Sequence, residues 1–139
     1  MTSLQKVTAI LFLLGASVAV RAHHSVPVNF DTSGSNTITG TLVAAKWVNP
    51  HSQLQVEVTD EDGGKEIWLI EMNAKNTINR IGKTMGFTFD DFVVGETITV
   101  QGWPGRNDRS IYFRSCILAS GQKIVWQSRL DPNLEKIEN

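Results

Sequence analysis

Polar and apolar residues alternate in short runs along the chain between residues 37 and 126. In the run Gln53–Thr59, Leu54, Val56 and Val58 alternate with the polar residues Gln55 and Glu57. A period of two is expected of a strand with one buried face and one face in water. Runs that are rich in β-branched and aromatic residues and bounded by turn residues predict six strands: Thr37–Trp47, Gln53–Thr59, Glu66–Met72, Thr97–Trp103, Ser110–Leu118 and Lys123–Trp126.

One segment after the third run has a helical pattern instead. In Asn73–Ile81, Ile78 and Ile81 share one face of a helix. Asn73 is suited to the N-cap of this helix, and Gly82 can end it. The irregular segment that follows supplies three aromatic residues expected to fill the core: Phe87, Phe89 and Phe92.

The order of these elements predicts the fold class. Three antiparallel strands, one helix and then further strands are the order of the five-stranded oligonucleotide/oligosaccharide-binding (OB) barrel. A small β-sandwich can have similar strands, but the single helix between the third and fourth strands is harder for it to explain. We therefore expect an all-β fold with one short helix, built as an antiparallel, OB-like barrel of five to six strands.

The first 22 residues have the character of an export signal. The stretch Val7–Val20 carries no charge and follows a short segment with one lysine. It is shorter than the roughly 20 apolar residues that a transmembrane helix requires, so an uncleaved anchor is the less favoured alternative. Val20 and Ala22 are suited to the positions before a cleavage site, although a cut after Ala19 is an alternative.

Cleavage after Ala22 divides the chain into three parts. Residues 1–22 form the signal peptide, residues 23–126 an OB-like barrel domain with an N-terminal arm, and residues 127–139 a C-terminal tail. We expect the mature protein in the periplasm or secreted, with no stable membrane anchor. Loss of Lys6 and Arg21 with the signal lowers the basic count from 13 to 11 against 14 acidic residues, a net charge of −3. This balance argues against a nucleic-acid partner.

The single cysteine, Cys116, stands beside Ile117 and Leu118 in a predicted strand. We interpret it as a small buried hydrophobic residue. An intermolecular disulfide is the alternative in an oxidising compartment.

The three histidines of the chain are the strongest chemical signal. His23 and His24 follow the expected cleavage site, and His51 lies in a turn that Pro50 stiffens. A free α-amine, with a pKa near 8, and the imidazole of the same residue can bind a metal together. A further histidine nitrogen completes a set of ligands that divalent copper prefers. The alternative is a disordered polar start, with His51 bonded to a turn carbonyl.

Glu71, at the end of the third predicted strand, is the carboxylate that the topology brings nearest to His51. We expect it to orient a histidine ligand or to be a fourth ligand of the metal. Its alternative role is a surface charge or a partner of Arg80. The hypothesis is thus a metal site, copper first, built from His23, His24, His51 and Glu71.

A second group of residues suggests an organic ligand. Four tryptophans lie on or at the ends of strands, where they can form a stacking platform or, more commonly, pack in the core and at its rim. The residues considered for ligand binding are Trp47, Asn49, Arg106 and Arg109. The chain has no nucleophile elbow and no glycine-rich phosphate loop, which disfavours hydrolytic catalysis.

Several motifs resemble those of a family of small exported bacterial proteins of unknown function. They cover most of residues 22–126 in the same order: AHHS at 22–25, KWVNPH at 46–51, WLIE at 68–71, VGETITVQG at 94–102 and RSCILASGQK at 114–123. The resemblance implies export and a small β fold, but it implies no reaction.

Three hypotheses follow for the function. The first is an exported binding module with a copper site at its histidines. The second is a metal-free module that binds a glycan, a peptide or a protein through the barrel face and the Arg106–Arg109 loop. The third is a copper-dependent redox enzyme, which should consume oxygen or peroxide when a reductant is present.

Overall fold

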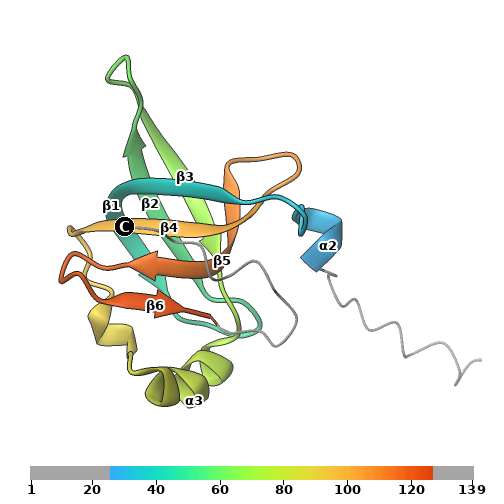
Figure 1. The fold of residues 1–139 in the computed structure, drawn as a ribbon, viewed down its shortest axis with the longest axis vertical. Coiled ribbons are helices and arrows are strands. Elements are labelled where there is room, and N and C mark those ends of the chain that lie inside the picture. Colours follow the sequence, from blue (N-terminus) through green and yellow to red (C-terminus); the bar gives the residue numbers. More distant parts are fainter. Residues whose placement is uncertain (1–25, 127–139) are drawn as a thin grey trace, which may run out of the picture.

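The computed structural model describes residues 26–126, in which a single sheet closes into a barrel. Figure 1 shows the short helix α2 on one side of the barrel and the longer helix α3 beneath it. The strands are β1 (Asn36–Lys46), β2 (Gln53–Thr59), β3 (Lys65–Glu71), β4 (Thr97–Pro104), β5 (Ser110–Ile117) and β6 (Lys123–Val125). The helices are α2 (Val26–Asn29), α3 (Lys75–Met85) and the 3₁₀ turn η1 (Phe89–Asp91).

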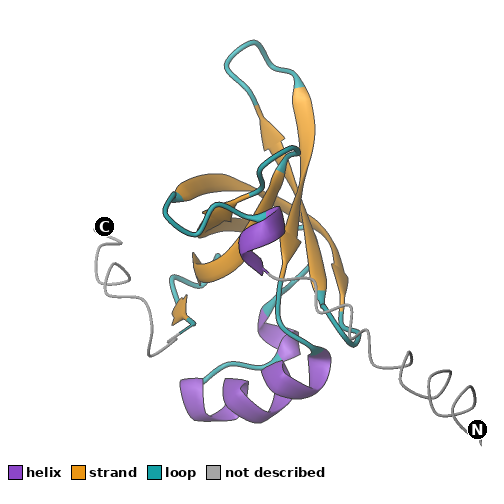
Figure 2. Cartoon of the chain, turned by 90° about the vertical axis from the view of Figure 1, so that its right-hand side faces the viewer, coloured by secondary structure: helices purple, strands orange, loops and turns teal. Residues whose placement is uncertain are grey.

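The strand order β3-β2-β1-β4-β5-β6, with a further pairing of β3 to β5, is that of a closed five-stranded barrel with a sixth strand at its edge. Strand β1 pairs with β2 through its second half and with β4 through its first half. A register shift between Leu42 and Ala44 bends β1 between the two partners. The OB-like barrel predicted from the sequence is confirmed, and Figure 2 shows the barrel from the side of α2.

The barrel closes through a parallel pairing of β3 with β5. The prediction of an antiparallel barrel did not include this pairing. Leu69, Ile70 and Glu71 of β3 pair with Ser110, Ile111 and Tyr112 of β5. Strands β1 to β3 reverse direction at each turn, and α3 then carries the chain across the bottom of the barrel before β4 begins. Because of this crossover, β5 runs in the same direction as β3.

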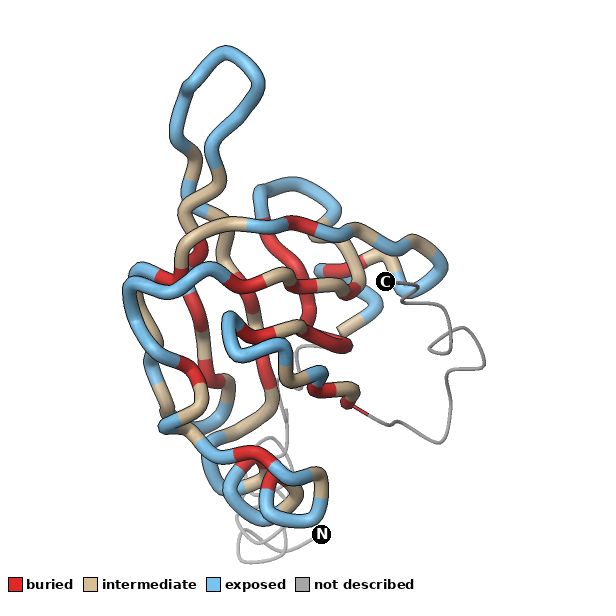
Figure 3. Tube along the Cα trace, turned by 60° about the vertical axis from the view of Figure 1, so that its left-hand side comes forward, coloured by how far each residue is buried: buried red, intermediate tan, exposed pale blue. Residues whose placement is uncertain are grey.

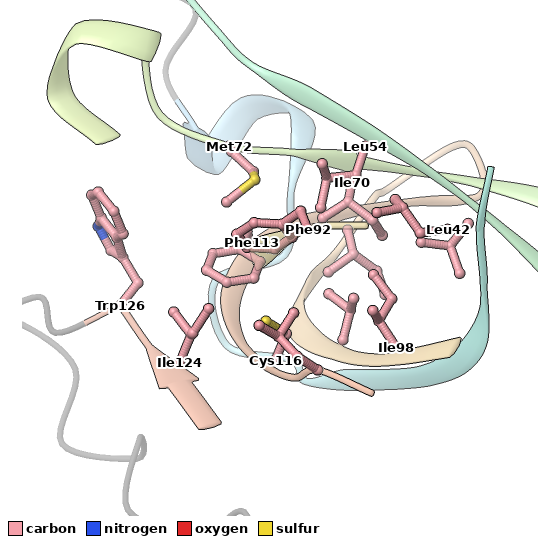
Figure 4. Packing of buried hydrophobic residues seen from close by; sticks show 14 of the residues in the cluster. Leu42, Leu54, Ile70, Met72, Phe92, Ile98, Phe113, Cys116, Ile124 and Trp126 are labelled. Carbon is pink, nitrogen blue, oxygen red and sulfur yellow. The ribbon is translucent and has the colours of Figure 1, made fainter. Parts of the chain in front are cut away.

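The core lies inside the barrel and continues down to α3 and η1. Figure 4 shows buried hydrophobic side chains from several strands packed against one another, and Figure 3 shows buried positions spread along the strands between exposed and intermediate ones. Hydrophobic strand residues with no exposed surface are Leu42, Leu54, Val56, Ile70, Val100 and Ile111. Phe87 and Phe92 are buried and Phe89 packs against the same cluster, which confirms that these aromatics fill the core.

The predicted strands are found with ends shifted by one residue at most, whereas the predicted helix is displaced. It runs from Lys75 to Met85 rather than from Asn73 to Ile81, and its N-cap is Ala74, without a side-chain hydrogen bond. It ends at Gly86, which has a φ of 79°. Gly82 lies inside the helix, where a Cβ atom would stand 2.8 Å from the carbonyl oxygen of Phe87. That glycine therefore serves the packing of Phe87 and does not end the helix.

Candidate functional site

The turn that carries His51 is held in place by α3 and by its own hydrogen bonds. The side chain of Asn49 accepts a hydrogen bond of 3.2 Å from the backbone N–H of Asn76, in the first turn of α3. The buried hydroxyl of Ser52 donates to the carbonyl of Val48 at 3.1 Å. The Asn49–Pro50 peptide bond is cis. The two hydrogen bonds anchor the turn that carries His51, in line with the stiffening expected from Pro50.

His51 and Glu71 lie side by side, as the topology predicted. The Nδ1 atom of His51 is 3.1 Å from Oε1 of Glu71, and their side chains are 35% and 23% exposed. Although this is ion-pair distance, Nδ1 is enclosed and no hydrogen bond of acceptable geometry reaches it within the described residues. The carboxylate is thus positioned to orient the imidazole from its Nδ1 side.

Glu71 also faces β5, where it pairs across the sheet with Tyr112. Tyr112 is 8% exposed and stacks on Trp103 with ring centroids 5.7 Å apart. Burial raises the pKa of its phenol, the negative charge of Glu71 raises it further, and Arg114 opposes the shift. The guanidinium of Arg114 lies 4.4 Å from the centre of the Trp103 ring. A carboxylate, a phenol and a cation therefore share one side of the barrel.

The segment that follows His23 and His24 is anchored next to this cluster. Phe30, directly after α2, is 3% exposed and packs edge-on against Tyr112 at 5.4 Å. The backbone N–H of Arg106 donates to the carbonyl of Asn29 at 2.9 Å. A cavity of about 260 Å³ lies here, lined by Asn29, Phe30, Leu69, Glu71, Asn107, Asp108 and Ser110. Glu71 therefore contacts both the His51 turn and the cavity beside α2.

Of the predicted metal ligands, the structure places His51 and Glu71, whereas His23 and His24 lie outside the described residues. Within residues 26–126, no three histidine, cysteine or acidic side chains are grouped closely enough to hold a metal. Arg80 is exposed on α3, and the ion pair found for Glu71 is with His51. The pair is therefore one part of the predicted site.

The residues considered for binding an organic ligand do not form one surface. Trp47 packs on the aromatic cluster below the barrel, 4.6 Å from Phe89, and Asn49 supports α3. These contacts favour the packing interpretation of the tryptophans. Arg106 donates from Nε to the carbonyl of Pro27 at 3.1 Å, beside α2. It is also among the causes that keep the pKa of Asp31 below its usual range, after the hydrogen bonds from Ser33.

Arg109, three residues further along the same loop, forms an ion pair with Glu66 of β3 at 2.6 Å. Both arginines line an open hollow of about 740 Å³ with Ile67, Leu69, Gly105, Asn107 and Asp108. Of the four residues considered for ligand binding, Arg106 and Arg109 line this surface depression, whereas Trp47 and Asn49 do not.

Cys116 is 1% exposed, as the sequence predicted for a buried hydrophobic residue. Burial raises the pKa of its thiol to about 12. The thiol is therefore protonated and enclosed at neutral pH, which argues against a reactive or bridging role.

Sequence reasoning missed Tyr112, Phe30 and the cavity beside α2. Tyr112 is the single tyrosine of the chain and stands in a run of apolar residues, so the sequence marks it as core. Its position opposite Glu71 depends on the parallel pairing of β3 and β5, for which no local pattern gives a signal.

These features define a class: a small closed β-barrel of OB topology with a histidine–carboxylate pair at the turn between its first two strands. The chain belongs to DUF6152, a family of unknown function, whose match covers residues 10–112. The resemblance to a family of unknown function is thereby confirmed. No curated protein matches the chain.

Two solved structures show what the chain is similar to. One is the N-terminal domain of the PriB protein from Thermoanaerobacter tencongensis, with 14% identity, 62% of this chain and 96% of that chain covered, and a TM-score of 0.45. The other is yeast Stn1 and Ten1, with 15% identity, 68% of this chain and 44% of that chain covered, and a TM-score of 0.39. Among the helices of residues 26–126, none is long and apolar enough to cross a membrane.

Proposed function

We propose that this protein is an exported binding module that holds copper through His51, His23 and His24, with Glu71 as the residue that orients His51. The observation that carries the proposal is the 3.1 Å approach of Glu71 Oε1 to His51 Nδ1. A carboxylate beside one ring nitrogen is the usual partner of a histidine whose other nitrogen binds a metal.

We infer the tautomer of His51 from this approach. A negative charge 3.1 Å from Nδ1 favours the proton on that nitrogen electrostatically. The lone pair is then on Nε2, where a metal can bind. The side chain is 35% exposed, so access from solvent remains open.

The position of α2 supports the participation of the two N-terminal histidines. The helix begins at Val26, two residues after His24, and two extended residues span about 7 Å at most. Its last residue, Asn29, lines the same cavity as Glu71. The chain length therefore keeps His24 within about 7 Å of the start of α2, the helix whose last residue shares this cavity with Glu71.

The ligand types favour copper. Imidazole and amine nitrogens bind divalent copper more tightly than the other divalent first-row metals, in a tetragonal arrangement. Calcium and magnesium prefer six or more oxygen ligands, and Glu71 offers one carboxylate.

The first test is copper titration of the protein that begins at His23. We expect His51→Ala to weaken copper binding by roughly tenfold or more, because it removes a nitrogen ligand. Glu71→Gln should weaken it by about tenfold, because the amide cannot stabilise the Nδ1–H tautomer as a carboxylate does. Equal affinity of the parent protein and His51→Ala would remove His51 from the site.

Two controls separate the site from general effects. Glu57→Gln removes a carboxylate that pairs with Lys65 on the hairpin, at 2.7 Å, and should leave copper affinity unchanged. One residue added before His23 moves the α-amine away from the imidazole of His23. Copper affinity should fall in this variant only if the site uses the α-amine. The intact mass of the exported protein, denatured and native, gives both the cleavage site and the bound metal.

The hollow at Arg106 and Arg109 favours a second candidate function, a metal-free module that recognises a glycan, a peptide or a protein. A glycan array and defined peptides distinguish its ligand classes. Absence of binding in both would count against this function.

A further inference from the structure

One edge of strand β3 is open near the tip of its hairpin. Strand β3 pairs with β2 along its whole length, from Lys65 to Glu71. Its pairing with β5 begins at Leu69, so that among the described strands Lys65–Trp68 has a neighbour on the β2 side alone. Figure 1 shows this part of the hairpin projecting above the barrel.

The direction of the backbone groups along this edge follows from two hydrogen bonds. Leu69 donates its N–H to the carbonyl of Arg109 at 3.0 Å, on the β5 side, and Met72 donates to Ser52 at 2.8 Å, on the β2 side. Backbone groups of successive residues in an antiparallel pair point alternately toward the partner strand and away from it. Lys65 and Ile67 therefore direct their N–H and C=O groups to the open side.

The open edge borders the hollow of about 740 Å³ between β3 and the loop from Gly105 to Arg109. Ile67 is 48% exposed and lines this hollow together with Leu69. An open edge with an apolar residue is a site where proteins add a strand from another chain.

The charges at the rim of this hollow indicate which kind of peptide can add to the edge. Arg109 is 61% exposed and Arg106 is 45% exposed, and both line the hollow. Asp108, the one carboxylate in that lining, accepts a hydrogen bond from Ser110. Arg109 pairs with Glu66 at 2.6 Å and Arg106 lies 3.9 Å from Asp31. Exposed ion pairs of this kind contribute little to stability, so either arginine can exchange its partner for a carboxylate of the peptide.

We propose that this groove binds an extended acidic peptide segment, which adds as a strand to β3 through the backbone groups of Lys65 and Ile67. An apolar side chain of the peptide packs on Ile67 and Leu69, and an acidic one pairs with Arg109. The proposal does not rest on copper binding, since neither the open edge of β3 nor the two arginines include a proposed metal ligand.

The test uses a blocked synthetic peptide of alternating valine and glutamate, with amide exchange read residue by residue by NMR. In the free protein the Ile67 amide exchanges quickly, whereas the Trp68 amide, which faces β2, is protected. Added peptide slows exchange at Ile67 by roughly tenfold or more, the effect of one or two new hydrogen bonds. Slow exchange at Ile67 without peptide, or no change on adding it, overturns the proposal.

Variants distinguish strand addition from other binding. Ile67→Pro removes the N–H that faces the groove and leaves the β2 pairing intact, so it should weaken the peptide by about tenfold. Protection of the Trp68 amide reports whether Ile67→Pro is folded. If Ile67→Pro does not fold, Ile67→Lys, which keeps the backbone donor, takes its place.

Arg109→Glu should weaken the acidic peptide and favour a peptide of alternating valine and lysine. Equal affinity of the parent protein and Ile67→Pro overturns the proposal. Protection of Ile67 that rises with protein concentration alone also overturns it, because the edge would then pair with a second copy of the chain.

Discussion

At the scale of single residues, the central observation is that Glu71 stands between His51 and Tyr112. It approaches the imidazole at 3.1 Å on the turn side, and its charge raises the pKa of the phenol on the β5 side. One carboxylate therefore influences both an imidazole and a phenol.

The titration of Tyr112 tests this arrangement directly, because the chain has one tyrosine. We expect phenolate absorbance to appear above the ordinary pKa of 10. Glu71→Gln should lower the midpoint while leaving it above 10, since burial is the larger cause. The folded state holds this proton more tightly than the unfolded chain, so the associated stability is present below pH 10 and is lost as the pH rises above it. A midpoint unmoved by Glu71→Gln, with Glu57→Gln as the control, would contradict the proximity.

Cys116 gives the second prediction at this scale. Its thiol is 1% exposed and its pKa is raised to about 12, so a thiol reagent at neutral pH should modify it only when the protein unfolds. The labelling rate should rise by orders of magnitude in denaturant and follow the loss of structure. Fast labelling of the folded protein would mean that β5 opens locally.

At the scale of elements, the contact between Asn49 and α3 determines the position of the His51 turn. Asn49→Ala leaves the N–H of Asn76 without its partner in the first turn of the helix, where Ala74 supplies no side-chain cap. We expect a loss of about 1 kcal/mol in the free energy of unfolding, the usual value of an N-terminal cap. Urea unfolding measures it, and Asn107→Ala on the exposed loop is the control, with an expected change within about 0.5 kcal/mol.

How far the sequence predicts each element depends on how local its determinants are. The strands were predicted to within a residue because alternation and turn residues are local signals. The helix was misplaced because its start depends on Asn49 and its end on Gly86, while Gly82 and Asn73 resemble cap residues. The proximity of His51 and Glu71 was predictable because β2 and β3 form a hairpin that returns the chain to its starting point. Tyr112 reaches Glu71 through a long-range parallel pairing, and no local pattern indicates it.

At the scale of the whole molecule, β4 and β5 approach closely at Gly102, next to the residues of β5 that close the barrel on β3. A Cβ atom at this position would collide with the carbonyl oxygen of Tyr112, and the register of the two strands shifts between Gln101 and Gly102. The glycine therefore allows β5 to turn toward β3 and to place Tyr112 opposite Glu71.

Gly102→Ala should therefore cost more than an ordinary glycine substitution. We expect a loss of about 3 kcal/mol or more, because the methyl group meets rigid backbone rather than a flexible side chain. Gly121→Ala is the matched control. Gly121 has a φ of 82° with open space around its Cα, so alanine there adds conformational strain of about 1 kcal/mol. Denaturant unfolding of both variants gives the comparison. A similar loss in the free energy of unfolding for the two variants would mean that β4 and β5 can move apart at Gly102 while the barrel stays closed. The close approach at Gly102 would then not be what holds Tyr112 beside Glu71.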